Sequence, residues 1–180
     1  MVYRFLLLSD EAGNFKREIQ INPQATFLDF HNAILEATGF DKDQLYSFFV
    51  CGDDWSKQTE ITLIEMDTSS EEDSYIMEST CLEDFIMEEH QKLLYVFDPM
   101  SERVFFIELM EIITRKKLKE AVCTLTAGNP PQQFMDYTAA SLDIVSDLDE
   151  NFYGDDEYDD DELDDLERGS FDDLPSDDRF

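Results

Sequence analysis

The C-terminal end of the chain is an acidic segment, which leaves the preceding residues to build any core. Residues 134–180 hold nineteen Asp and Glu residues against Arg168 and Arg179, a formal charge near −17. Residues 142–152 could form a turn or two of amphipathic helix. From Gly154 onward the dense carboxylates repel one another. The few apolar side chains there cannot offset the conformational entropy lost when a chain folds. We predict one domain at 1–133 and a mostly disordered, acidic low-complexity tail at 134–180.

The charge of the chain limits its classes of partner. The 180 residues carry a formal charge of −31, which repels nucleic acid and anionic lipid and favours basic protein surfaces. We therefore expect no nucleic-acid or membrane binding. The candidate docking residues in the tail are its most densely packed acids: Asp155, Asp156, Glu157, Asp159, Asp160, Asp161 and Glu162.

The same carboxylates do not form a calcium loop. An EF-hand loop needs ligands at alternating positions, a central Gly and a Glu at position twelve, and residues 155–162 lack that spacing. Any cation binding there should be weak and diffuse, and we predict no metal site and no cofactor. Two other interpretations of the tail stay open. It could only solvate the chain, or it could mimic nucleic acid, which requires carboxylates held in register.

The cysteines and the N-terminal sequence favour a soluble, cytoplasmic protein. Cys51, Cys81 and Cys123 are odd in number and form no Cys-x-x-Cys pair, which is typical of reduced, packed thiols rather than of disulfides. The apolar run at 5–8 is four residues long. A signal peptide needs about 7–15 apolar residues and a membrane span about 20.

The N-terminal residues predict a β-hairpin followed by a helix. Residues 2–9 and 15–21 alternate as strands do, around a turn that contains Gly13. Thr26 is a good helix N-cap, because Asp29 stands three residues later in the capping-box position. Apolar residues then recur at helical spacing until Gly39, which we expect to end the helix.

The remainder of the domain predicts further strands and one short helix. A polar loop is expected at 67–79, and a short helix is expected from Leu82, capped by Ser79 or Thr80. Runs rich in apolar and β-branched residues predict strands at 45–51, 59–66, 93–97, 104–113 and 121–126.

The basic cluster 115–119 could contact the tail or simply be a solvated strand end.

Several short motifs follow one another in a characteristic order and spacing. The first is the segment 26–34, and the others are Gly39-Phe40, Leu45-Tyr46-Ser47-Phe48, Leu82-Glu83-Asp84-Phe85-Ile86, Leu94-Tyr95-Val96-Phe97-Asp98 and Asn129-Pro130-Pro131. Together they resemble the plasmid pRiA4b ORF-3-like family, also known as insertion-element passenger proteins, and the segment 26–34 is similar to the family's Leu-x-x-Leu-His-x-x-Ile helix. The resemblance covers about residues 3–133. It implies an α+β fold with a curved, mainly antiparallel sheet, one main helix and one short helix, and no established activity.

Three departures from the family pattern bear on function. Gln44 stands where the family has a second histidine before Leu-Tyr. The family's Asp-Phe-Gly-Asp-x-Trp turn keeps only its first residue, Asp98, and the family's Cys-Pro-Pro-Glu segment is represented by residues 129–132. If the family builds a polar site from these residues, this chain lacks most of it, which favours a binding or structural role.

The residues with the clearest catalytic potential are His31 and Asp98. His31 lies on the apolar face of the predicted helix, where a hydrogen-bonded core histidine is the commoner case. The alternative is an enzyme with a degenerate polar pocket in which His31 acts as a general base beside Asp98. A zinc site needs three or four ligands, and the other histidine, His90, has no paired spacing.

A second candidate site is the acidic turn at Asp53, Asp54 and Trp55. It could be an exposed turn without function, or a recognition tip whose indole and carboxylates suit a basic partner. Because the sequence shows no catalytic constellation but has an aromatic-rich sheet and a charged tail, we expect a non-enzymatic protein-interaction module. In this hypothesis the sheet recognises a partner, while the acidic tail raises the rate of encounter with basic surfaces in a salt-sensitive way.

Overall fold

The N-terminal residues form the predicted hairpin. The computed structural model describes residues 1–65 and 75–135. In it, β1 (Val2–Leu8) pairs antiparallel with β2 (Lys16–Ile21). Alternate side chains of β1, at Tyr3, Phe5 and Leu7, are buried. This alternation places one face of the hairpin against the core and leaves the other face more exposed.

The helix α1 (Phe27–Thr38) begins and ends where the sequence predicts. Thr26 and Asp29 form a capping box: the Asp29 N–H donates to Thr26 Oγ1 at 3.1 Å, and the Thr26 N–H donates to the Asp29 carboxylate at 2.9 Å. Gly39 ends the helix at a φ of +74°, and its N–H donates to the Leu35 carbonyl. A residue without a Cβ adopts this left-handed conformation at little cost.

Within residues 1–65 and 75–135, eight strands form one open sheet in the order β5-β4-β3-β6-β7-β1-β2-β8, so β5 and β8 are its edges. Every pairing is antiparallel except that of β4 with β5. The α+β class, the main helix and the mainly antiparallel sheet are as predicted. The strands after β2 are β3 (Ser47–Cys51), β4 (Lys57–Thr62), β5 (Tyr75–Ile76), β6 (Lys92–Asp98), β7 (Arg103–Ile113) and β8 (Val122–Ala127).

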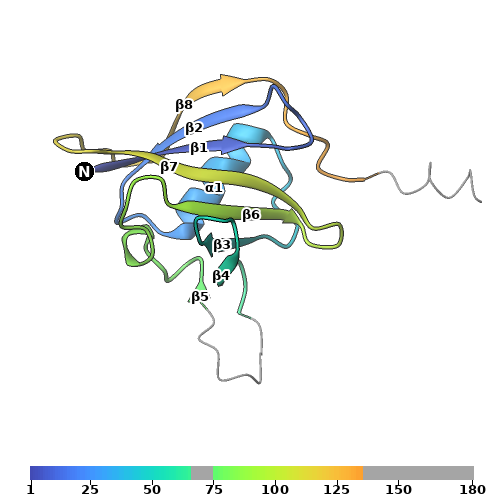
Figure 1. Cartoon of the computed structure of the whole chain (residues 1–180), viewed down its shortest axis with the longest axis horizontal. Helices are drawn as coiled ribbons and strands as arrows, with labels where there is room; N and C mark the ends of the chain where they lie inside the picture. Colours follow the sequence, from blue (N-terminus) through green and yellow to red (C-terminus); the bar gives the residue numbers. More distant parts are fainter. Residues whose placement is uncertain (66–74, 136–180) are drawn as a thin grey trace, which may run out of the picture. The chain divides into compact units, whose positions relative to one another are not determined.

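The core lies between α1 and one face of the sheet. In the view of Figure 1 the helix lies behind the strands. Phe30 of α1 stacks on Phe5 of β1 and on Phe48 of β3, with ring centroids 4.6 and 5.4 Å apart, and all three side chains are fully buried. Buried aromatic rings contribute much of the apolar area removed from water, so this layer fixes the helix on the sheet.

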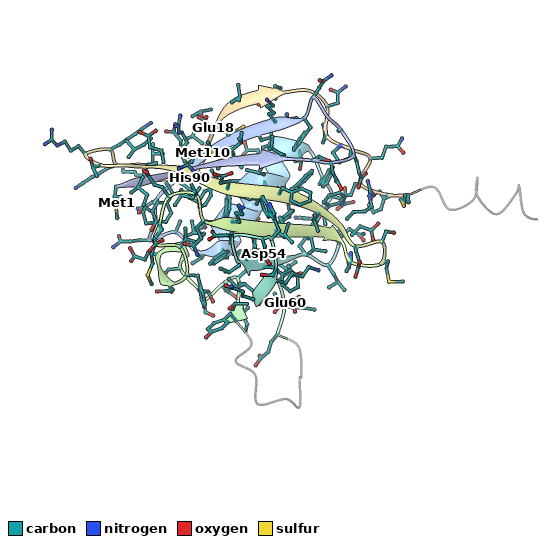
Figure 2. All side chains as sticks on the ribbon, in the orientation of Figure 1. Met1, Glu18, Asp54, Glu60, His90 and Met110 are labelled. Carbon is teal, nitrogen blue, oxygen red and sulfur yellow. The ribbon has the colours of Figure 1, made fainter. Side chains whose placement is uncertain are left out.

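The other face of the sheet, here called the open face, carries a mixed set of side chains. Figure 2 shows it from Glu18 on β2 through Met110 on β7 to Glu60 on β4. Its centre is a row of cross-strand neighbours, here called the apolar row, made of Leu8, Phe106, Leu94 and Phe49. Glu60 pairs with Phe49 at the end of this row.

The structure corrects two details of the sequence interpretation. Tyr75–Ile76 form a short strand inside the predicted loop, because they pair with β4 and extend the sheet edge. The predicted short helix is present as a 3-10 helix at Leu82–Asp84, but it is capped by Cys81 rather than by Ser79 or Thr80. The Cys81 N–H donates to the Asp84 carboxylate at 3.0 Å.

The cysteines differ in their burial. Cys51 is buried, Cys81 is half-buried and Cys123 is exposed, and all three are free thiols. The predicted packed role therefore fits Cys51, whereas Cys123 on β8 faces solvent because β8 is an edge strand.

The described part of the chain ends just beyond β8. Residues Met1–Met135 form one compact unit. The predicted disorder of the acidic tail falls on residues outside the described part, so that expectation stays a prediction. Within the described residues, none of the helices has the length and apolar character needed to cross a membrane.

Candidate functional site

The predicted recognition tip is the tight turn between β3 and β4, here called the Trp55 turn (residues 52–56). Its ends are closed by two hydrogen bonds of 3.0 Å, from the Trp55 N–H to the Gly52 carbonyl and from the Gly52 N–H to the Ser56 carbonyl. Trp55 has a φ of +66°. This conformation is strained for a bulky residue and occurs in tight turns and at functional sites.

The Trp55 ring lies over the open face of the sheet. Its centroid is 5.0 Å from that of Phe106 on β7, with the two ring planes at 89°. The ammonium of Lys92, at the start of β6, lies 5.1 Å from the centre of the Trp55 ring. The turn between β3 and β4 thus reaches across β6 to β7 and covers Phe106, an inner member of the apolar row, leaving Trp55 half-buried.

Exposed carboxylates lie next to Trp55 in the turn and on the strand that follows it. Asp53 and Asp54 are exposed, as is Glu60 on β4. The Asp54 carboxylate accepts hydrogen bonds from the hydroxyl and the backbone N–H of Ser56. These bonds lower the pKa of Asp54, so its charge is retained at neutral pH. A half-exposed indole beside fixed negative charge attracts cations.

The predicted catalytic histidine lies in the core. His31 is 2% exposed, its Nδ1 is 2.8 Å from the Tyr95 hydroxyl, and its ring centroid is 4.8 Å from that of Tyr46. Burial lowers the pKa of His31 to about 4, since a charged imidazole is poorly solvated there. The side chain is therefore neutral at physiological pH and packs as a polar member of the aromatic core.

Asp98 has different partners from those of His31. Its carboxylate accepts hydrogen bonds from the backbone N–H groups of Met100 and Ser101 at 3.1 and 3.3 Å, and it lies 3.8 Å from the Arg103 guanidinium. These contacts close the turn between β6 and β7. The arrangement gives Asp98 a structural role in the turn, whereas His31 bonds to Tyr95.

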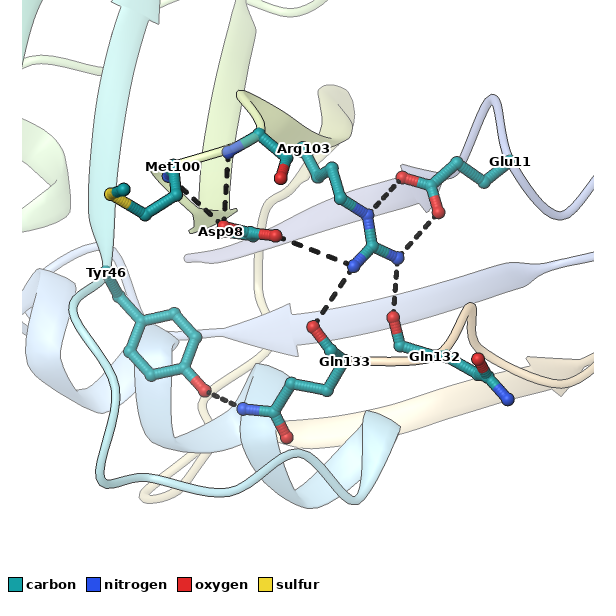
Figure 3. Close-up of polar contacts among 8 residues, drawn as sticks. Glu11, Tyr46, Asp98, Met100, Arg103, Gln132 and Gln133 are labelled. Carbon is teal, nitrogen blue, oxygen red and sulfur yellow. Dashed lines mark hydrogen bonds and ion pairs between the residues drawn. The ribbon is translucent and has the colours of Figure 1, made fainter. Parts of the chain in front are cut away.

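Arg103 is the centre of a polar network that the sequence interpretation missed. Figure 3 shows its guanidinium between Glu11, Asp98 and the carbonyl groups of Gln132 and Gln133. Two hydrogen bonds of 2.7 and 2.6 Å reach the Glu11 carboxylate. Glu11 is 92 positions from Arg103, so no local pattern could reveal the pair.

Gln133 attaches the end of the described chain to the aromatic core. Its side-chain Nε2 donates to the Tyr46 hydroxyl at 2.8 Å and to the Asp41 carbonyl at 3.0 Å. Its side-chain Oε1 accepts from the Asp41 N–H at 2.6 Å. Burial, with a smaller effect of the Asp41 charge, raises the pKa of Tyr46 to about 12. Residues 132–133 are thereby fixed immediately before the acidic segment.

Two open pockets lie beside the β7–β8 connection, away from the predicted site residues. One, of about 550 Å³, is lined by Asn22, Pro23, Glu83 and Lys117, among others. The other, of about 260 Å³, is lined by residues of α1 and by Lys119. Across residues 1–65 and 75–135, no group of three or more His, Cys, Asp or Glu side chains is arranged to hold a metal ion.

The acidic residues predicted to dock on a partner, Asp155, Asp156, Glu157, Asp159, Asp160, Asp161 and Glu162, lie outside the described residues. Of the predicted interaction residues, the structure therefore places Asp53, Asp54 and Trp55, and it brings them together in one turn. It also adds Lys92 and Phe106. Their positions follow from strand pairing, and sequence spacing alone gives no sign of them.

Comparison with known proteins agrees with the family resemblance. The family described as Plasmid pRiA4b ORF-3-like protein matches residues 4–172. The chain belongs to this family. The match extends beyond the predicted domain boundary at 133 and into the acidic segment. No curated protein matches the sequence, and the family is one of unknown function.

A solved structure shares the family fold. It is the crystal structure of a protein of unknown function, MM3350, from Methanosarcina mazei Go1. The two structures superpose with a TM-score of 0.57 at 21% sequence identity, over 83% of this chain and 84% of the other. Identity at this level supports a shared fold and carries no information about activity.

Proposed function

We propose that this chain is a non-enzymatic protein-interaction module that binds basic segments of other proteins. The recognition element is the Trp55 turn on the open face of the sheet, and the acidic tail is an accessory that attracts basic surfaces. The observation that carries the proposal is the strained Trp55 backbone, which holds an indole against Phe106 while Asp53 and Asp54 remain exposed.

Physical reasons support a basic partner. The formal charge of −31 raises the local concentration of cationic segments and speeds their association, an effect that weakens as salt screens it. Long-range attraction alone gives little specificity. A fixed indole beside two carboxylates adds a short-range site, where a cation–π contact contributes about 0.5–2 kcal/mol.

The polar residues near the core support a binding role over catalysis. His31 bonds to Tyr95 in the core, and Asp98 closes a turn beside Arg103. General acid–base catalysis needs a group that reaches its substrate and titrates near the working pH. A buried histidine whose pKa is about 4 meets neither condition. The three free thiols are consistent with the cytoplasmic location that we propose.

The proposal is tested with labelled peptides whose binding is followed by fluorescence anisotropy. An arginine-rich peptide should bind the full chain, while acidic and uncharged peptides of equal length should not. The Asp53→Asn/Asp54→Asn double variant should weaken binding several-fold, and this effect should decline less with salt than that of the tail, because the contacts are short-range. Truncation after Met135 should weaken binding mainly at low salt, because the tail acts at long range.

A chain that binds the arginine-rich peptide no better than the uncharged one would contradict the proposal. Loss of all binding on truncation, with no effect of the Asp53 and Asp54 substitutions, would place recognition in the tail and remove the Trp55 turn from the account.

A further inference from the structure

Lys92 occupies the cation-attracting side of the Trp55 turn. It is the first residue of β6, and its ammonium lies 5.1 Å from the centre of the Trp55 ring. The same ammonium donates a hydrogen bond to the carbonyl oxygen of Asp53. The chain thus supplies its own cation to the indole and the turn backbone that we propose as the recognition site.

The surroundings of Lys92 explain why its ammonium lies at the turn. Its cross-strand neighbours are Cys51 on β3 and Glu108 on β7. The Glu108 carboxylate is already engaged with the His90 ring at 2.8 Å. The negative charge of Asp54 also acts on Lys92. An indole face, a carbonyl oxygen and a nearby carboxylate together attract a cation more strongly than any one of them does alone.

A partner's cation cannot share this place with Lys92. Two like charges a few ångströms apart repel each other, and one face of one indole accepts one cation. A basic segment that uses this face of Trp55 must therefore displace the Lys92 ammonium into solvent. The apparent dissociation constant is then the intrinsic one divided by the fraction of molecules in which Lys92 has left the site.

We propose that Lys92 is an internal competitor at the Trp55 turn, and that an arginine side chain of a basic protein segment displaces it. This inference rests on the proposed function and names the chemical group that the turn recognises. Arginine is the better competitor because its planar guanidinium stacks on aromatic faces and is more weakly hydrated than an ammonium. A lysine-rich segment offers only the group that is already bound there.

The test uses the full chain and a fluorophore-labelled arginine-rich peptide at fixed salt. Lys92→Met keeps an aliphatic side chain of similar length but removes the positive charge next to the Trp55 ring. Lys42→Met, in the exposed α1–β3 connection, makes the same change in net charge and is the matched control. We expect Lys92→Met to bind about 2- to 10-fold more tightly than Lys42→Met, within the range of one cation–π contact. Lys92→Arg, which competes better, should bind more weakly than the wild-type chain.

Each outcome decides between the two proposals. If the wild-type chain binds but Lys92→Met binds no more tightly than Lys42→Met, Lys92 only supports the turn, and the competitor idea is wrong while the proposed function stands. If no version binds the peptide, both proposals fail. Should thermal unfolding show that Lys92→Met is not folded, Lys92→Arg decides the matter: binding equal to or tighter than wild type overturns the competitor role.

Discussion

Arg103 and Glu11 are joined by two hydrogen bonds of 2.7 and 2.6 Å, although they lie 92 positions apart in the sequence. Arg103 is 8% exposed and begins β7, whereas Glu11 lies in the turn between β1 and β2. The same guanidinium donates to the carbonyl groups of Gln132 and Gln133. One side chain therefore holds together two turns and the segment that leads into the acidic tail.

Replacing Glu11 should destabilise the fold. Glu11→Gln leaves a largely buried guanidinium without its bidentate carboxylate, which typically costs about 1–3 kcal/mol. The change in the free energy of unfolding is measured by urea denaturation. Glu60→Gln, an exposed carboxylate on β4, is the control and should change stability by less than about 0.5 kcal/mol. Equal effects of the two substitutions would show that the Arg103 network contributes nothing special.

His31 should make stability depend on pH. Its pKa is about 4 in the folded chain against 6.5 for an ordinary histidine, so between these values the unfolded state binds a proton that the folded state does not. The contribution of His31 to the free energy of unfolding should therefore be fully present well above pH 6.5 and be lost progressively as the pH drops toward 4. Between pH 7 and pH 5 we expect His31 to account for a loss of about 1–2 kcal/mol.

The carboxylates of the chain also respond to acid, so the histidine effect needs a matched comparison. His31→Gln keeps a hydrogen-bonding amide near Tyr95 but cannot titrate. Urea denaturation of both proteins at pH 7 and pH 5 should show a smaller loss for the variant. If both lose the same free energy, the pKa of His31 is not depressed in the folded state.

Gly128 should tolerate no side chain. It follows β8 at a φ of +64°, and a Cβ atom there would lie 2.3 Å from the Asn14 carbonyl oxygen. Gly128→Ala should therefore cost about 2–4 kcal/mol through strain and overpacking. Gly13→Ala is the control, because a Cβ at Gly13 would meet nothing within 4 Å. Similar melting temperatures for the two variants would argue against the close approach of β8 to the first turn.

Phe106 should hold the Trp55 ring on the sheet. Phe106→Ala removes the ring that lies 5.0 Å from that of Trp55, so the indole should become more hydrated and its fluorescence should shift to longer wavelength. Phe49→Ala removes a neighbouring ring of the apolar row that contacts Lys57 instead. This control should shift the emission less. Identical shifts would mean that Phe106 does not position Trp55.

Local patterns were sufficient for much of the fold. The capping box of Thr26 and Asp29 and the stop at Gly39 act within a few residues, so their meaning could be read directly from the sequence. The two-residue strand Tyr75–Ile76 could not be predicted, because it exists only through its pairing with β4. Short edge strands depend on their neighbours more than on propensity.

The candidate site was only partly predictable. Asp53, Asp54 and Trp55 are consecutive, so an acidic aromatic turn was evident from spacing alone. The contacts of Trp55 with Lys92 and Phe106 depend on sheet order, which places β3, β6 and β7 side by side. The sequence left two positions open for His31, in the core or in a pocket. The structure places it in the core, where its hydrogen-bond partner Tyr95 comes from β6, a strand that is distant in sequence.

Binding of a basic protein segment at the Trp55 turn should be visible in the fluorescence of Trp55 itself. The chain contains one Trp, so intrinsic tryptophan emission monitors this turn alone. Titration with an unlabelled arginine-rich peptide should change the emission of the full chain to saturation, with the same midpoint as the anisotropy of the labelled peptide. Peptide binding that leaves the Trp55 emission unchanged would contradict the account.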